Sequence, residues 1–297
     1  MSRLARKKAL PKNRVVALID IGSSSAAAAL VEVGGDKPIV LAHKRVAMPI
    51  DGSRGAAGLE ARMLTAAREA VRQVSRGRHA GKATSVAVFL PSPWSALTLD
   101  RIRFARAAPF VADEALVRRL MNVRLQREEH PGAGEAFGYT LSGMRLNGYA
   151  ADFFGETPIM EIELTLGSAR ASRSLLERLG ALARELSSAP ADFYSSILAA
   201  AQALSLVITD ENDYLICDSE GETAELLLVR DAIPEAHASI PAGRAGIVRT
   251  VALHGGFDTR EISSALTLMA DPRSPMSLSA SGAIAAGRRA CAERLGA

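Results

Sequence analysis

The feature that most constrains this fold is a strand-turn-strand pattern close to the N-terminus. Residues 15–20 (VVALID) are apolar and β-branched and end in a carboxylate, a Gly/Ser turn occupies positions 22–25, and an apolar run resumes at Ala26. β-branched runs that are bounded by glycine and serine are typical of strands. The sequence therefore predicts a hairpin over 14–30 whose first strand delivers Asp20 to a tight turn.

The composition of this turn suits a phosphate. The backbone N–H groups and hydroxyls of Gly22, Ser23, Ser24 and Ser25 can converge on one anion, and the Asp20 carboxylate can hold a hydrated Mg²⁺ beside it. A plain β-turn is the structural alternative, because Asp-Gly-Ser turns are common.

A second hairpin about two hundred residues later has a similar form. A strand is predicted at 214–218 and another at 224–229, and the turn between them follows Asp218 and contains Gly221 and Thr223. Two such hairpins can hold the phosphates of a nucleotide from both sides.

With these two hairpins the chain resembles the superfamily of actin, Hsp70 and the sugar kinases. The opening run VVALIDIGSSS resembles that of FtsA and PilM, bacterial proteins of cell division and of type IV pilus assembly. The order of later segments is similar to that of FtsA: 145–149 and 159–166, then 196–211, the second hairpin, and 240–244 with Arg249. The resemblance covers residues 14–269.

The resemblance implies an α/β fold of the actin-like, ribonuclease H-like type, with duplicated βββαβαβα domains and an inserted FtsA-type α+β subdomain called 1C. The expected parts are a basic tail at 1–13, the first part of subdomain 1A at 14–84, the 1C-like insertion at 85–166, further 1A helices at 167–210, and an incomplete 2A/2B-like region at 211–297. The family fold needs more chain than this last region offers, so the second half is expected to be a fragment or reduced.

Apolar periodicity predicts the other elements. Strands are expected at 38–46, 85–90, 94–104, 139–146 and 160–166, and helices at 57–75, 113–129, 172–186, 193–206 and 261–269.

The resemblance also implies the site. Asp20 and Asp218 would be the carboxylates for Mg²⁺, and phosphate contacts would come from Gly22, Ser23, Ser24, Ser25, Gly221 and Thr223. The second turn departs from the family pattern, because Glu220 stands where a glycine is expected and Ala224 falls on the threonine position. A carboxylate at that point repels a phosphate. The family's Gly-Gly adenosine motif is also missing, and His254-Gly255-Gly256 is interpreted as a turn.

Composition excludes several classes. The hydrophobic content of 48% and charged content of 23% are those of a globular protein. The longest apolar stretch, 196–208, is too short to span a membrane, and the first apolar run is ended by Asp20, so no signal peptide is predicted. We therefore expect a cytoplasmic protein, at the inner face of the membrane if its partners lie there.

A zinc centre and nucleic-acid binding are disfavoured. The five histidines are scattered, which argues against zinc, and Cys217 and Cys291 are expected to be packing residues. The net charge is only +4, and the arginines of 101–127 are interleaved with acidic residues, so no stacking platform for bases is expected among them. This arrangement favours a solvated surface, or an acidic protein or lipid partner, over nucleic acid. A basic helix at 283–295 is expected to be an ordinary surface helix.

The leading hypothesis is an FtsA-like scaffold of a membrane-associated assembly that binds ATP and Mg²⁺ weakly as a structural switch, with at most weak ATPase activity. Its partners would be proteins of a division or pilus machine, with self-association and peripheral membrane association through those partners. The alternatives are a PilM-like pilus component, an interaction module that binds no nucleotide, and an active ATPase or kinase of the superfamily.

Overall fold

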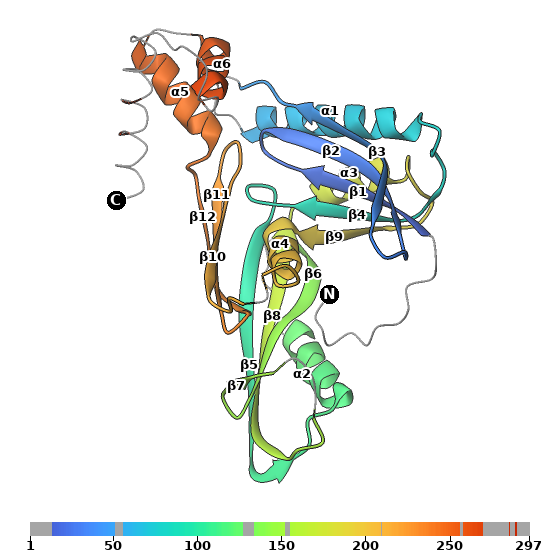
Figure 1. The fold of residues 1–297 in the computed structure, drawn as a ribbon, viewed down its shortest axis with the longest axis vertical. Helices are drawn as coiled ribbons and strands as arrows, with labels where there is room; N and C mark the ends of the chain where they lie inside the picture. Colours follow the sequence, from blue (N-terminus) through green and yellow to red (C-terminus); the bar gives the residue numbers. More distant parts are fainter. Residues whose placement is uncertain are drawn as a thin grey trace.

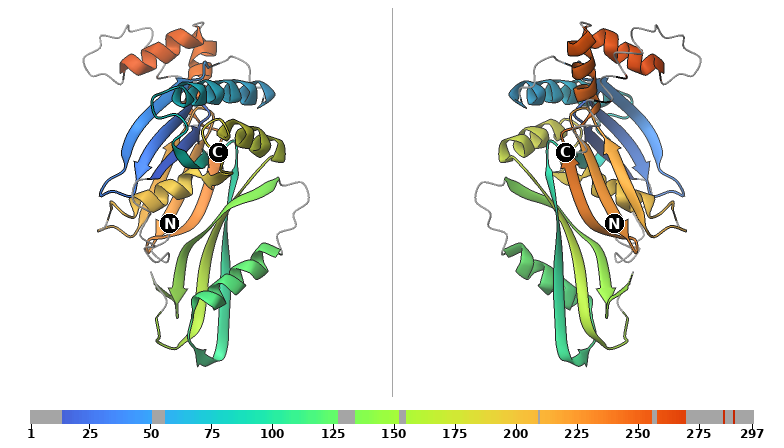
Figure 2. Two further views of the ribbon diagram at one scale, coloured as in Figure 1. Left: turned by 90° about the vertical axis from the view of Figure 1, so that its right-hand side faces the viewer. Right: turned by 90° about the vertical axis from the view of Figure 1, so that its left-hand side faces the viewer.

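The computed structural model describes residues 14–50, 56–126, 134–151, 155–208, 210–255 and 258–269, together with residues 285 and 289. Its strands form three sheets (Figure 1). In Figures 1 and 2 a lobe containing β5, β6, β8 and α2 projects from the first sheet, and α5 and α6 lie at the opposite end of the molecule.

The first sheet has five strands in the order β3-β2-β1-β4-β9. Strands β1 (Arg14–Ile21), β2 (Ser25–Val33) and β3 (Ile39–Ala47) form an antiparallel meander, and β4 (Ala83–Leu90) and β9 (Ala191–Ser195) continue the sheet in parallel with β1. Helices α1 (Ala56–Ser75) and α3 (Arg173–Ala183) bury one face of this sheet. The alternation within β1 explains this: Ala17, Ile19 and Ile21 point into the core, and the residues between them stay partly exposed.

The helix predicted over 193–206 is wrong in its first part. Residues 191–195 form β9, and α4 begins only at Ser196 and ends at Leu204. The cause is tertiary: Phe193 lies opposite Val88 in the parallel pairing with β4, and the ring of Tyr194 stacks on that of Phe89 at 5.7 Å. Strand pairing here overrides the helical periodicity of the segment.

The second sheet is the projecting lobe. Strands β5 (Ala96–Phe110), β6 (Glu135–Leu146), β7 (Tyr149–Ala150) and β8 (Ile159–Ala171) pair antiparallel in the order β5-β8-β6-β7. Helix α2 (Glu114–Gln126) packs on this sheet through Leu116 and Val117, and Asp113 Oδ1 accepts the N–H of Leu116 at its start. The boundaries proposed for the insertion, 85 and 166, fall inside β4 and β8, so the strand predicted at 85–90 belongs to the first sheet.

The third sheet repeats the opening meander. Strands β10 (Tyr214–Ser219), β11 (Ala224–Arg230) and β12 (Ile233–Ile240) are antiparallel, and α5 (Arg244–Gly255) and α6 (Thr259–Met269) follow. His254 and Gly255 therefore end a helix, where a turn was predicted, and Gly256 lies outside the described residues. Most of the predicted helix 283–295 and the tail 1–13 are also outside them.

Two further observations concern expectations from composition. Cys217 is exposed on β10, which contradicts its interpretation as a packing residue; it lies on the outward-facing side of an alternating strand. Cys291 lies outside the described residues. Among the helices that the structure describes, none combines the length and the apolar character needed to cross a bilayer.

Candidate functional site

Three hydrogen bonds fix the first predicted turn, at residues 22–25. The N–H of Gly22 donates to the carbonyl of Ser25 at 2.9 Å, which closes the turn on itself. The indole N–H of Trp94 donates to the carbonyl of Gly22 at 3.1 Å, and the N–H of Met48 donates to the carbonyl of Ser24 at 2.8 Å. The turn is thus a fixed element.

Asp20 is already paired in this structure. Arg45 of the neighbouring β3 donates to Asp20 Oδ2 at 2.9 Å and to Ser25 Oγ at 2.7 Å. Sequence reasoning did not identify Arg45, because its position beside Asp20 follows only from the pairing of β2 with both β1 and β3.

The second turn, 220–223, packs on the start of α5. The N–H groups of Arg244 and Ala245 donate to the carbonyls of Glu220 and Gly221 at 3.0 and 2.6 Å. A Cβ at Gly243 would lie 2.4 Å from the carbonyl oxygen of Gly221, so only glycine permits this approach. Because the first N–H groups of α5 are used by the turn, they are not available to an external anion.

The two turns contact each other directly. The N–H of Glu222 donates to Ser23 Oγ at 2.8 Å, and the N–H of Ser23 donates to Glu220 Oε2 at 3.2 Å. A Cβ at Gly221 would lie 2.6 Å from the carbonyl oxygen of Ser23, so the two backbones touch. The structure therefore brings Gly22, Ser23 and Gly221 together, and the carboxylate of Glu220 lies against the first turn.

The carboxylates around these turns repel one another. Burial raises the pKa of Glu220 above its ordinary value, and the negative charges of Asp218 and Asp20 raise it further, against the hydrogen bond from Ser23. Burial likewise raises the pKa of Asp218, with contributions from Glu225 and Asp20. Asp20 and Asp218 are thus close enough to interact, but no group of three or more His, Cys, Asp or Glu side chains in the described ranges is arranged to hold a metal ion.

The hydroxyl of Thr223 is bonded to the loop that follows β4. Its hydroxyl is buried and donates to the carbonyl of Ser92 at 2.9 Å. The neighbouring Glu225 is also buried; it accepts the N–H of Ser92 at 3.0 Å and lies 3.0 Å from His237 Nε2. This polar network fastens the loop after β4 to the third sheet.

Glu222 has a strong partner that the sequence did not reveal. Arg249 of α5 donates through two nitrogens to its two carboxylate oxygens, one of these bonds measuring 2.9 Å. Both side chains are largely buried, at 10% and 21% exposure. This bidentate pair holds the second turn against α5.

In this conformation the two turns do not fit a nucleotide phosphate. The N–H of Ser23 donates to the Glu220 carboxylate, and Gly221 packs against the first turn. A cavity of about 710 Å³ adjoins the turns; it is lined in part by Ser24, Ser25, Arg62, Arg244 and Arg260.

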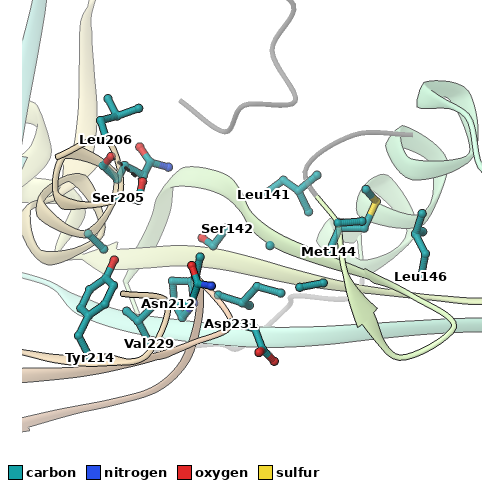
Figure 3. Close-up of a pocket in the computed structure, with 18 of the residues that line it drawn as sticks. Leu141, Ser142, Met144, Leu146, Ser205, Leu206, Asn212, Tyr214, Val229 and Asp231 are labelled. Atoms are coloured by element: carbon teal, nitrogen blue, oxygen red, sulfur yellow. Dashed lines mark hydrogen bonds between the residues drawn. The ribbon is translucent and has the colours of Figure 1, made fainter. Parts of the chain in front are cut away.

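A groove of about 660 Å³ lies at the other end of the third sheet (Figure 3). Its walls come from β6, from residues between β7 and the start of β8, from α4 with the residues that lead to β10, and from the turn between β11 and β12. Most lining residues are apolar, among them Leu141, Met144, Leu206, Tyr214 and Ile233. The groove is not predictable from local sequence patterns, because the segments that line it meet only in the folded chain.

The charged residues of the groove all carry negative charge. The charged lining residues are Glu211 and Asp231, and both are acidic. Asp231 accepts a hydrogen bond from Arg145 at 2.9 Å, and burial raises the pKa of Tyr214. The groove is therefore apolar with an acidic margin.

Comparisons with known proteins agree with this architecture. No family model matches the chain, and no curated protein matches its sequence. A structure of the PilM-PilN type IV pilus biogenesis complex is similar, with a TM-score of 0.61 and 17% identity over 97% of this chain and 74% of that one.

Two further structures match with lower scores. The ethanolamine utilization protein EutJ from Carboxydothermus hydrogenoformans has a TM-score of 0.45 and 14% identity, over 99% of this chain and 73% of that one. A protein of unknown function with an actin-like ATPase fold from Bacteroides thetaiotaomicron has a TM-score of 0.40 and 12% identity, over 82% and 78%. With the order of the first sheet and the repeated meander, the likeness to PilM shows that this chain has an actin-like ATPase fold.

Proposed function

We propose that this chain is an actin-fold scaffold that binds a partner protein in the groove between β6, α4 and the β11-β12 turn. The observation that carries the proposal is the groove itself, an apolar depression of about 660 Å³ with an acidic margin. Concave apolar sites with a few polar groups are where proteins bind ligands and partner segments.

The exposed surface beside the groove supports a protein partner. Leu206, which lines the groove, is 67% exposed, and the adjacent Val207 is 78% exposed. Adjacent exposed apolar side chains next to an apolar groove are typical of an interaction site.

The occupant that we propose is a segment of a partner protein that carries apolar side chains and at least one basic residue. Glu211 and Asp231 are the charged residues of the lining, and Asp231 is already paired with Arg145. A basic side chain would therefore gain its attractive contact chiefly at Glu211, where an acidic one would be repelled.

The type IV pilus is the assembly that the structural likeness favours, because the similar PilM is found in a complex with PilN. A PilM-like role as a cytoplasmic pilus assembly component is therefore the function we propose. Nucleotide would have at most a weak, structural role, with Asp20 and Asp218 as the carboxylates for Mg²⁺, because the turns do not present a free phosphate site.

The test uses fluorescence polarisation with three synthetic twelve-residue peptides that share a leucine-rich frame and carry two Arg, two Ser or two Glu residues. The Arg peptide is expected to bind best, and Leu206→Ser to weaken it about tenfold, as expected for losing one large apolar contact of 1.4 kcal/mol. Glu211→Lys should remove the preference for the Arg peptide. Val40→Ser, at an apolar residue 60% exposed on β3, is the matched control and should change nothing.

Binding that is equal for all three peptides, or unaffected by Leu206→Ser, would contradict the docking site. The pilus assignment is tested separately by co-purification with the PilN-like protein of the same organism. Peptide binding without PilN binding would exclude the pilus role and leave the groove as a docking site.

A further inference from the structure

The contact between Glu220 and the first turn has the chemistry of anion binding. The turn presents a backbone N–H at Ser23 that donates to Glu220 Oε2 at 3.2 Å. Glycine-containing turns bind phosphate with such N–H groups. Here the acceptor is a carboxylate of the same chain, 197 positions away in the sequence.

The fit around this carboxylate is close. A Cβ at Gly22 would lie 2.7 Å from Glu220 Oε2, so the absence of a side chain at Gly22 leaves the space that the carboxylate fills. The turn that carries Glu220 is fixed by its own hydrogen bond from the N–H of Glu220 to the carbonyl of Thr223 at 2.9 Å, and by the N–H of Arg244. The position of the carboxylate is thus set by two elements.

This arrangement places a negative charge where it is costly. Glu220 is half-buried and lies near Asp20 and Asp218, and its pKa is raised for these reasons. A glutamine would accept the same hydrogen bond without a charge. A charged group at a position where burial and neighbouring charges disfavour it is typical of a functional contact.

We propose that the Glu220 carboxylate occupies the phosphate position of the first turn and holds the two turns together without nucleotide, so that a polyphosphate binds only by displacing it. The third sheet and the first sheet are then kept in contact by an internal anion. This inference concerns the turns and stands independently of the groove.

The test measures binding of sodium tripolyphosphate and of Mg-ATP by calorimetry to four proteins. Wild type is expected to bind weakly, in the millimolar range or not at all, and Glu220→Gly at least tenfold more tightly. Glu220→Gln removes the charge but keeps an acceptor for the N–H of Ser23, so its affinity should lie between the two. Glu185→Gln, at an exposed glutamate after α3, is the control for loss of one negative charge.

Each other result overturns the proposal. If wild type binds as tightly as Glu220→Gly, the position is not occupied in solution. If Glu220→Gln binds as tightly as Glu220→Gly, charge repulsion alone is responsible. If no variant binds either anion, the turn is not a phosphate site.

A second measurement remains decisive if Glu220→Gly does not fold. In wild type without added anion, the Ser23 amide should be protected from hydrogen exchange at least tenfold, because its N–H donates to Glu220 Oε2. Glu220→Gln keeps an acceptor at this position and should keep the protection. A Ser23 amide that exchanges in wild type as fast as an exposed amide would refute the contact.

Discussion

The Arg249–Glu222 pair shows how much a single residue can determine at this site. Its two side chains come from α5 and from the second turn, and both are removed from most solvent. The attraction in such a pair is offset by the loss of hydration of both charges, so breaking it from one side is far costlier than removing it altogether.

Arg249→Met is therefore expected to lower the free energy of unfolding by about 3–5 kcal/mol, because Glu222 is left buried without a counter-charge. The double change Arg249→Met with Glu222→Gln should recover part of this loss. Urea unfolding measures both. Arg118→Met, in the exposed pair with Glu114 on α2, is the control and should cost about 0–1 kcal/mol. A double variant less stable than Arg249→Met would refute this account.

Glu220 makes the stability of the chain depend on pH. Its pKa is raised in the folded state, so folding favours its protonated form. The resulting stabilisation is complete below the unfolded pKa of about 4.3 and is lost as the pH rises through the folded value. Glu220→Gln should therefore become progressively more stable relative to wild type across this interval, with a constant difference above it.

Urea unfolding of both proteins between pH 4 and pH 8 checks this expectation. Asp218 titrates with the same sign, but it is present in both proteins. A difference in stability that shrinks as the pH rises would show that the carboxylate of Glu220 is favoured in the folded chain.

For single residues, the sequence predicts which residue types form the two turns but not their hydrogen-bond partners. Asp20, Gly22 and Ser23 are recognisable from one short segment. The partners that occupy them, Arg45 and Glu220, depend on register and on a contact between distant turns, neither of which a local pattern contains.

Among the elements, the turn between β11 and β12 carries unusual backbone strain. Asp231 and Ala232 have φ values of 51° and 60°, the pattern of a two-residue type I′ hairpin turn. The turn is fixed by Asp213 Oδ1, which accepts the N–H of Asp231, and by the carbonyl of Asn212, which accepts the N–H of Ala232. Strain of this kind persists where the surroundings determine the conformation, and this turn forms one wall of the groove.

Ala232→Gly should stabilise the chain by roughly 0.5–1 kcal/mol. Glycine removes the steric strain of an alanine at positive φ, which is about 1–2 kcal/mol. This gain exceeds the cost of about 0.4–1 kcal/mol that glycine adds by increasing the conformational entropy of the unfolded chain. Ala236→Gly, in the extended backbone of β12, should instead destabilise it by about 0.5–1 kcal/mol. Thermal unfolding of the two variants gives the comparison, and a loss of stability in Ala232→Gly would exclude the strain.

Most helices and strands could be predicted from the sequence because the spacing of their apolar residues matches the face that the fold buries. Helix α1 and the meander β1-β2-β3 lie within three residues of their predicted positions. Two of the exceptions have different causes. Strand β9 has helical spacing but pairs with β4, so a contact distant in sequence decides its conformation. Strand β12, which was not predicted, pairs with β11 through a two-residue turn and packs beside the second sheet.

At the scale of the whole molecule, the described residues form several separate cores. One joins the first sheet with α1 and α3, and another lies between α2 and the distal part of the second sheet. Strands β6 and β8 run through both, since Phe137 and Ala169 belong to the first core and Met144 and Ile162 to the second. The fold class followed from the order of the two hairpins, whereas the division into cores follows from these long strands.

The two cores should open separately. Ile162→Ala, at a fully buried residue of the second core, should increase hydrogen exchange in α2 and in the distal part of β8 while β1 and β4 remain protected. Leu179→Ala, equally buried on α3, should have the converse effect. Exchange followed by mass spectrometry distinguishes them, and identical patterns for the two variants would indicate a single cooperative unit.

Trp94 gives the molecule an optical property. It is the one tryptophan in the sequence, it is 8% exposed, and its indole N–H is bonded to Gly22 of the first turn. When the protein is excited at a wavelength that only tryptophan absorbs, the fluorescence therefore comes from a single site beside Ser23 and Glu220. Any event that separates the two turns will change the polarity around that indole, so its fluorescence follows the state of the turns without a label.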